Sequence, residues 1–222
     1  MIKRWLIFVE ASTLALVTAG ANADPVLPPA KMVTQAQVDR LCDSSFDFAV
    51  AKPNEGLTFW DVTDGLIPAA GEGLWWRIDD ITLSAVVDPL GAHGPNTQVS
   101  VWQAPGNVLV ATALFTSDSG DWAYFVDYCY RPDGRLARTS STFNSFVAAD
   151  VPGGIRRERT KYFDRNGKVT DSRSAVSALS SGERLKIRVT GYDEPGYLTV
   201  STLPFYPLLS AALDQRPTGP NP

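Results

Sequence analysis

The order of apolar and polar residues along the chain changes from helical to strand periodicity. Apolar residues recur at helical spacing after Thr34, for example at Val38 and Cys42. Thr34 and Gln37 form a capping-box signature, in which each side chain can satisfy a backbone N–H of the other. The sequence therefore predicts a helix over about residues 35–45.

From Leu57 onward, alternating apolar positions and turn residues predict strands. We expect strands over 74–87, 97–103, 108–116, 122–130 and 184–190, and a short closing helix over 205–213. The segment 122–130 is apolar on both faces, so it should be a central strand that is covered on both sides.

Three segments share an aromatic residue, three turn formers, a glycine and, two positions later, an aliphatic residue. They are residues 130–136, 163–169 and 192–198. The pattern predicts hairpins in which glycine takes the left-handed conformation of a G1 bulge. Locally it resembles the tyrosine/aspartate hairpin repeats of some exported bacterial proteins, and the resemblance brings no functional residue. We expect a meander over residues 122–203 with three tips on one edge.

Together these elements predict an α+β or mainly-β fold, with a curved antiparallel sheet of successive hairpins and an N-terminal helix packed on one face. The expected organisation has a signal peptide, an extended leader, a single β-rich domain and a disordered Pro-rich tail. Their bounds are 1–23, 24–33, 34–213 and 214–222.

The first residues have the order of a secretory signal peptide. Lys3 and Arg4 precede a mostly apolar run over 5–17, and residues 21–23 (Ala-Asn-Ala) form a small-residue cleavage site. Glu10 interrupts the run, which leaves an uncleaved membrane anchor as the alternative. We expect cleavage and a periplasmic or secreted protein, with no membrane span afterwards.

Cys42 and Cys129 are the only cysteines in the chain. In an oxidising compartment such a pair is expected to form a disulfide, and two buried free thiols are the alternative. Only one histidine is present and there is no CxxC spacing, so we expect neither a metal site nor a cofactor.

The net charge of −4 is unevenly distributed. Residues 24–130 are acidic and residues 131–190 are basic. The two parts could neutralise each other, or the second could present a basic face to an anionic partner. Arg157, Arg159 and Lys161 alternate onto one strand face and would form the centre of that basic face. Nucleic acid is not an expected partner, because the protein is acidic overall and exported.

No residue pattern identifies a catalytic site. His93 lies in a loop-like Gly/Pro segment, and Asp118-Ser119 lacks the preceding glycine of a serine-protease nucleophile segment. Scattered carboxylates could form a hydrolytic pair only if the fold brought them together. These carboxylates are Asp61, Asp64, Asp79, Asp80 and Asp127. Tryptophans on predicted strands could stack on a ligand or lie in the core; they are Trp60, Trp75, Trp76, Trp102 and Trp122.

The leading functional hypothesis is an exported, non-catalytic binding protein for an apolar or anionic ligand. Its candidate ligand-binding residues are Trp75, Trp76, Arg157, Arg159 and Lys161. One alternative is an envelope module that binds another protein through its hairpin edge or basic face. The other is a carboxylate-based hydrolase.

Overall fold

The computed structural model describes most of the β-rich domain. The described residues are 34–61, 75–78, 97–117, 119–147, 151–189 and 193–215. The predicted signal peptide, the leader and the last seven residues of the predicted tail lie outside them. So do His93, Asp64, Asp79, Asp80, Asp118 and residues 79–87 of the first long predicted strand.

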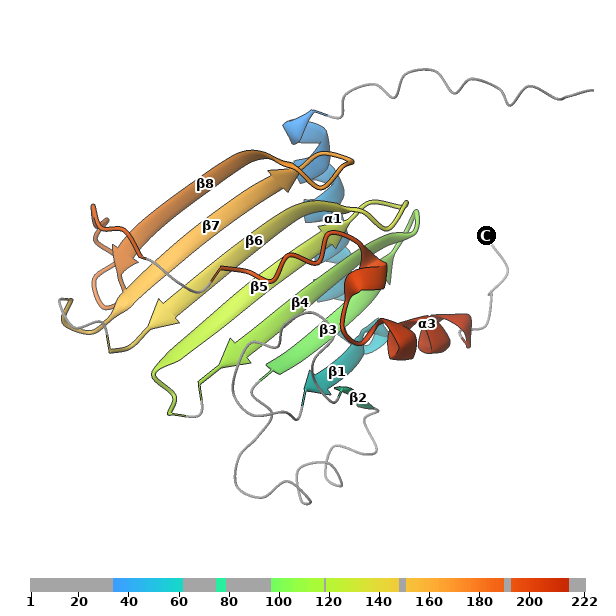
Figure 1. Ribbon diagram of the computed structural model, residues 1–222, viewed down its shortest axis with the longest axis horizontal. Coiled ribbons are helices and arrows are strands. Elements are labelled where there is room, and N and C mark those ends of the chain that lie inside the picture. Colours follow the sequence, from blue (N-terminus) through green and yellow to red (C-terminus); the bar gives the residue numbers. More distant parts are fainter. Residues whose placement is uncertain are drawn as a thin grey trace, which may run out of the picture. The chain divides into compact units, whose positions relative to one another are not determined.

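Eight described strands form one antiparallel sheet in the order β2-β1-β3-β4-β5-β6-β7-β8 (Figure 1). Their bounds are β1 Leu57–Asp61, β2 Trp75–Ile78, β3 Thr97–Ala104, β4 Val108–Thr116, β5 Trp122–Tyr130, β6 Leu136–Ser145, β7 Ile155–Phe163 and β8 Val169–Ala178. The helices are α1 Gln35–Ala51, η1 Pro53–Glu55, η2 Val200–Thr202 and α3 Tyr206–Asp214. From β3 to β8 each strand pairs with the next one along the chain. The predicted sheet of successive hairpins with an N-terminal helix is confirmed.

Two of the three predicted hairpin tips are present. Gly134 (φ 75°) and Gly167 (φ 78°) take the left-handed conformation, which glycine adopts without a Cβ clash. The strand register shifts at the residue pairs Cys129/Tyr130 and Tyr162/Phe163, as a bulge next to each tip requires. These tips join β5 to β6 and β7 to β8.

The third predicted tip, at residues 192–198, is wrong. Residues 193–199 form no hairpin, and the stretch instead bonds to the first tip, where Leu136 N donates to Leu198 O and Val200 N to Gly134 O. The physical reason is the position of proline. Pro132 stands second in its turn, which a type I turn favours, whereas Pro195 stands third, which it disfavours.

Successive residues of β5 point to opposite faces of the sheet, and different segments cover them. We call the face of Cys129 the helix face, because the Cys42–Cys129 disulfide ties α1 to it. Thr34 and Gln37 cap α1 through the predicted capping box. Buried apolar residues of α1 and of the sheet pack together here, among them Val38, Cys42, Ala49, Val108, Val110 and Ala137.

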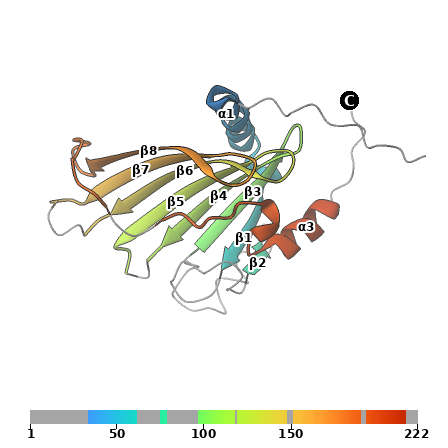
Figure 2. The same ribbon diagram turned by 45° about the horizontal axis from the view of Figure 1, so that its top comes forward.

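The helix covers only one end of the central strand, contrary to the expectation of full cover on both sides. Phe125 lies on the helix face and is 41% exposed, because α1 contacts β3, β4 and β6 at the Cys129 end. Figure 2 shows α1 against one side of the sheet and the C-terminal segment on the other.

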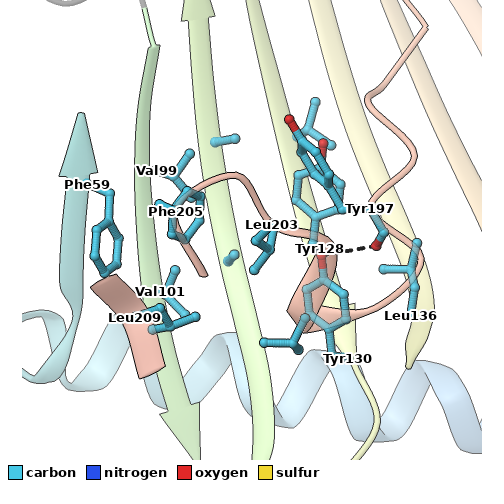
Figure 3. Packing of buried hydrophobic residues seen from close by; sticks show 14 of the residues in the cluster. Phe59, Val99, Val101, Tyr128, Tyr130, Leu136, Tyr197, Leu203, Phe205 and Leu209 are labelled. Carbon is cyan, nitrogen blue, oxygen red and sulfur yellow. Dashed lines mark hydrogen bonds between the residues drawn. The ribbon is translucent and has the colours of Figure 1, made fainter. Parts of the chain in front are cut away.

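The opposite face is covered by residues 193–205, which we call the strap, and by α3. Phe205 stacks on Phe59 with ring centroids 4.6 Å apart, and Leu209 of α3 is fully buried (Figure 3). The hydroxyls of Tyr128 and Tyr130 donate to the carbonyls of Pro195 and Tyr197, at 3.3 and 3.2 Å. Tyrosines spaced two apart thus hold the backbone of the strap on what we call the strap face.

The described part of the strand predicted over 184–190, residues 184–189, does not form that strand. Arg184 makes one bridge to Ser177 of β8, and Leu185 N donates to Val176 O. Leu185 and Val189 are half-buried, whereas Ile187 is 47% exposed, so the alternating aliphatic side chains of this segment are only partly buried. None of the helices in the described part of the chain is long and apolar enough to cross a membrane.

Candidate binding groove

The three basic residues that the sequence singled out lie together on the strap face. Antiparallel pairing places Arg157 beside Phe143 and Val176, and Arg159 beside Ser141 and Ser174. Lys161 follows two positions later on the same strand, so its side chain points to the same face. The structure therefore brings Arg157, Arg159 and Lys161 together as a stripe along β7.

Two carboxylates of the strap already bind part of this stripe. Arg159 donates to Asp193 Oδ1, and its Nη1 lies 3.5 Å from Glu194 Oε2. Lys161 Nζ lies 3.0 Å from Glu194 Oε1, and the Tyr124 hydroxyl donates to Glu194 Oε2 at 3.0 Å. We call this set of contacts the latch. The latch neutralises part of the basic stripe with carboxylates that lie outside the acidic segment 24–130.

The latch changes the acidity of both carboxyls. The hydrogen bond from Arg159 lowers the pKa of Asp193 below its ordinary value. Burial alone would raise the pKa of Glu194, but its own backbone N–H and Lys161 outweigh burial and lower the pKa. Both carboxylates therefore remain charged at neutral pH, and both hold the strap most firmly in that state.

Arg157 differs from its neighbours because it is almost fully buried. It is 2% exposed, its guanidinium lies 5.5 Å from the centre of the Phe143 ring, and it donates to Val189 O at 3.5 Å. A buried guanidinium over an aromatic ring gains cation–π attraction. Arg157 thus joins β7 to the segment before the strap.

A groove of about 330 Å³ lies between β7, β8 and residues 184–189. We call it the strap groove. Its lining consists of arginines, aliphatic side chains and one hydroxyl: Arg157, Arg159, Arg184, Arg188, Val176, Leu185, Ile187, Val189, Ala175 and Ser174. Arg184 and Arg188 are exposed and form no ion pair with any residue that the structure describes. The groove therefore combines positive charge with apolar walls.

The predicted tryptophans lie far from this stripe in the strand order. Trp75 is on β2, at the opposite edge of the sheet from β7, and its ring packs against Phe205 with centroids 4.9 Å apart. The side chain of Trp76 lies outside the described residues. The tryptophan pair and the basic stripe therefore do not form one site. Trp60 is buried and Trp102 packs against the α1 cluster, so both serve the core.

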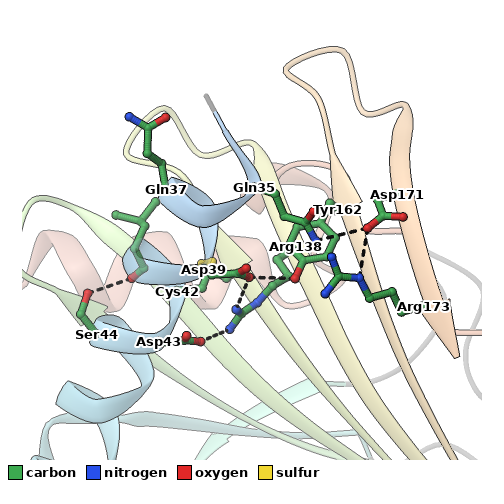
Figure 4. Close-up of polar contacts among 12 residues, drawn as sticks. Gln35, Gln37, Asp39, Cys42, Asp43, Ser44, Arg138, Tyr162, Asp171 and Arg173 are labelled. Carbon is green, nitrogen blue, oxygen red and sulfur yellow. Dashed lines mark hydrogen bonds and ion pairs between the residues drawn. A yellow bond between two sulfur atoms is a disulfide. The ribbon is translucent and has the colours of Figure 1, made fainter. Parts of the chain in front are cut away.

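Polar residues on the helix face hold α1 in place, and a smaller hollow lies on the same face. Arg138 donates to Asp39 and Asp43 of α1 at 2.9 and 2.7 Å, and Tyr162 also donates to Asp39 (Figure 4). The hollow, about 290 Å³, is lined mainly by hydroxyls, Phe125, Glu158 and Asp127. Burial raises the pKa of Asp127, and Thr112 donates to this carboxylate at 2.8 Å.

The two described carboxylates of the hydrolase hypothesis point away from each other. Asp61 is buried on the strap face of β1, whereas Asp127 lies on the helix face of β5. Ser119 bonds to Asp121 at 2.7 Å within the turn after β4, as a turn residue should. Within the described residues, no three His, Cys, Asp or Glu side chains gather as metal ligands would.

Sequence reasoning missed the residues that complete the groove. Arg184 and Arg188 lie in the segment predicted to be a strand over 184–190, and the start of the strap lies in the segment predicted to be the third hairpin tip. One signal was available: tyrosines at 124, 128 and 130 on one strand face need hydroxyl partners once buried. Those partners are Glu194 and the strap carbonyls.

Comparison of the chain with protein-family models, with curated proteins and with solved structures found no match in any of the three. The groove is therefore interpreted from its own chemistry.

Proposed function

We propose that this protein is an exported, non-catalytic binding protein whose strap groove holds an anionic ligand with an apolar part. The observation that carries the proposal is the lining of the groove, in which arginine side chains stand beside aliphatic ones. Export is supported by the signal-peptide order of the first residues and by the Cys42–Cys129 disulfide.

The anionic part of the ligand follows from local charge. Six cationic side chains lie on the strap face of β7 and on residues 184–188: Arg157, Arg159, Lys161, Arg184, Lys186 and Arg188. The carboxylates of residues 183–194 are Glu183, Asp193 and Glu194. A hollow with an excess of one charge concentrates field lines and attracts the opposite charge. Phosphate and carboxylate both suit arginine, because the guanidinium can donate two parallel hydrogen bonds to either group.

The aliphatic side chains that line the strap groove favour a ligand with an apolar part. Leu185 and Val189 are half-buried and Ile187 is 47% exposed, with Val176 beneath them on β8. Covering these side chains with an alkyl group contributes about 25 cal/mol per Å² of apolar surface removed from water. A ligand that carries both a charged head and a short alkyl chain uses both kinds of lining.

Isothermal titration calorimetry with four probes tests the proposal. The full chain, expressed with its own signal sequence and purified as processed by the cell, is titrated with octyl phosphate, octanoate, inorganic phosphate and octyl glucoside. We expect saturable binding of octyl phosphate or octanoate, and at least tenfold weaker binding of inorganic phosphate and octyl glucoside. The better of the two alkyl anions identifies the head group.

Paired variants locate the site. Arg188→Gln removes a cation from the groove, and Arg156→Gln removes one from the opposite face of β7, where Arg156 bonds Asn144. We expect Arg188→Gln to weaken binding about three- to tenfold, as for one charge-assisted hydrogen bond, and Arg156→Gln to leave it unchanged. Absence of saturable binding to either alkyl anion, or equal losses in both variants, would contradict the proposal.

A further inference from the structure

Arg159 belongs to both the latch and the strap groove. It lines the groove, and its Nη1 also contacts Asp193 and Glu194. Its side chain is only 17% exposed, so few of its donors remain open to a new partner. A second anion brought to this guanidinium would also lie close to the Asp193 carboxylate, and like charges repel.

The two latch carboxylates differ in how firmly they are held. The side chain of Glu194 is 3% exposed and contacts Lys161, Arg159 and the Tyr124 hydroxyl. The side chain of Asp193 is 74% exposed, and Arg159 is its ion-pair partner among the described residues. An exposed ion pair contributes little to stability, so Asp193 is the part of the latch that a competitor can displace.

Beyond Glu194 the strap does not depend on Arg159. The Tyr128 and Tyr130 hydroxyls hold the carbonyls of Pro195 and Tyr197, and Phe205 is buried against Phe59. Loss of the Asp193 contact would therefore loosen the start of the strap and leave the rest in place.

From this arrangement we propose that the ligand anion and the Asp193 carboxylate compete for Arg159, so that binding of the ligand in the groove breaks the contact between Arg159 and Asp193. The proposal rests on the function proposed above and adds its regulation. Because coupling between two contacts is reciprocal, a closed latch must weaken binding by the same factor by which the ligand weakens the latch.

Two single-charge variants separate competition from simple electrostatics. Asp193→Asn removes the carboxylate that bonds Arg159. Glu183→Gln removes the carboxylate of the residue before Arg184, and Glu183 forms no ion pair among the described residues. By calorimetry with octyl phosphate, we expect Asp193→Asn to bind roughly two- to fivefold more tightly than wild type. The affinity gained by Glu183→Gln should be less than half of the affinity gained by Asp193→Asn. Asp193→Ala should bind octyl phosphate as tightly as Asp193→Asn does. Thermal melts check that each variant folds.

The possible failures are distinguishable. If wild type binds saturably but Asp193→Asn gains no more than Glu183→Gln, competition is overturned and the binding function stands. If none of the proteins binds any of the alkyl anions, the binding function fails and the competition fails with it.

Discussion

The two covers of the sheet come from opposite ends of the domain and are held by different forces. On the helix face, α1 is tied by the Cys42–Cys129 disulfide and by buried apolar side chains. On the strap face, residues 193–197 are held by tyrosine hydroxyls and by ion pairs with β7. The disulfide and the apolar contacts of the helix face do not respond to pH or salt, whereas the ion pairs of Arg138 with Asp39 and Asp43 can. The polar contacts of residues 193–197 can respond to pH, to salt and to a competing anion. This difference is a reason to propose the strap face, rather than the helix face, as the binding face.

The largest effect should come from the helix face. Replacing both cysteines by alanine removes a crosslink between residues 87 apart in the sequence. The chain-entropy model then predicts a loss of about 4.5 kcal/mol in the free energy of unfolding. Urea denaturation of the double variant measures the loss, and Ser44→Ala, on the exposed side of α1, is the matched control. An unchanged denaturation midpoint would show that α1 does not depend on the crosslink.

A second large effect tests the apolar anchor at the end of the strap. Phe205 is 1% exposed and stacks on Phe59, so Phe205→Ala leaves a cavity between α3 and β1. We expect a loss of about 3 kcal/mol in the free energy of unfolding. Leu208→Ala, at a position of α3 that is 38% exposed, should cost under about 1 kcal/mol. Similar losses in the two variants would contradict the packing of α3 described here.

A smaller effect tests the polar attachment of the strap. Tyr130→Phe removes the hydroxyl that donates to Tyr197 O and leaves that buried carbonyl without this donor. The expected cost is about 1 kcal/mol, the ordinary value for one hydrogen bond. Hydrogen exchange should be faster at residues 197–199 and unchanged in α1. If exchange in α1 rises equally, the two covers are not independent.

The smallest effect expected is a pH dependence of the latch. The folded-state pKa of Glu194 is lowered, so its contribution is complete above the unfolded pKa of about 4.3 and is lost as pH falls through the folded value. Glu194→Gln should therefore destabilise the protein at pH 6 and do so by less at pH 3.5. Comparing variant and wild type by urea denaturation at each pH cancels the opposite effect of Asp127, whose pKa is raised. A difference that grows in acid would contradict the latch.

Local sequence chemistry was sufficient for the elements whose geometry depends on a few neighbouring residues. The capping box at Thr34 marked the start of α1, and Asp133-Gly134 and Asn166-Gly167 marked two hairpin tips. The strap was missed, although Pro195 in the third turn position argues against a type I turn. Its path is set by contacts with residues about 67 positions earlier in the chain, which no local pattern contains.

The candidate site was predictable only in part. Alternation on β7 placed Arg157, Arg159 and Lys161 on one face, as the structure shows. The sequence could not show that Asp193 and Glu194 bind two of them, or that Arg184 and Arg188 close a groove beside them. The tryptophan pair at 75 and 76 was grouped with the basic residues because strand order is invisible in sequence, and β2 and β7 lie near opposite edges.

Hydrogen exchange with and without octyl phosphate is the most direct test that the strap face is the responsive binding face. We predict slower exchange at residues 174–176 and 184–189, which line the groove, and faster exchange at residues 193 and 194. Exchange in α1 should not change. Protection on the helix face, or no change at residues 184–194 at saturating ligand, would contradict this assignment.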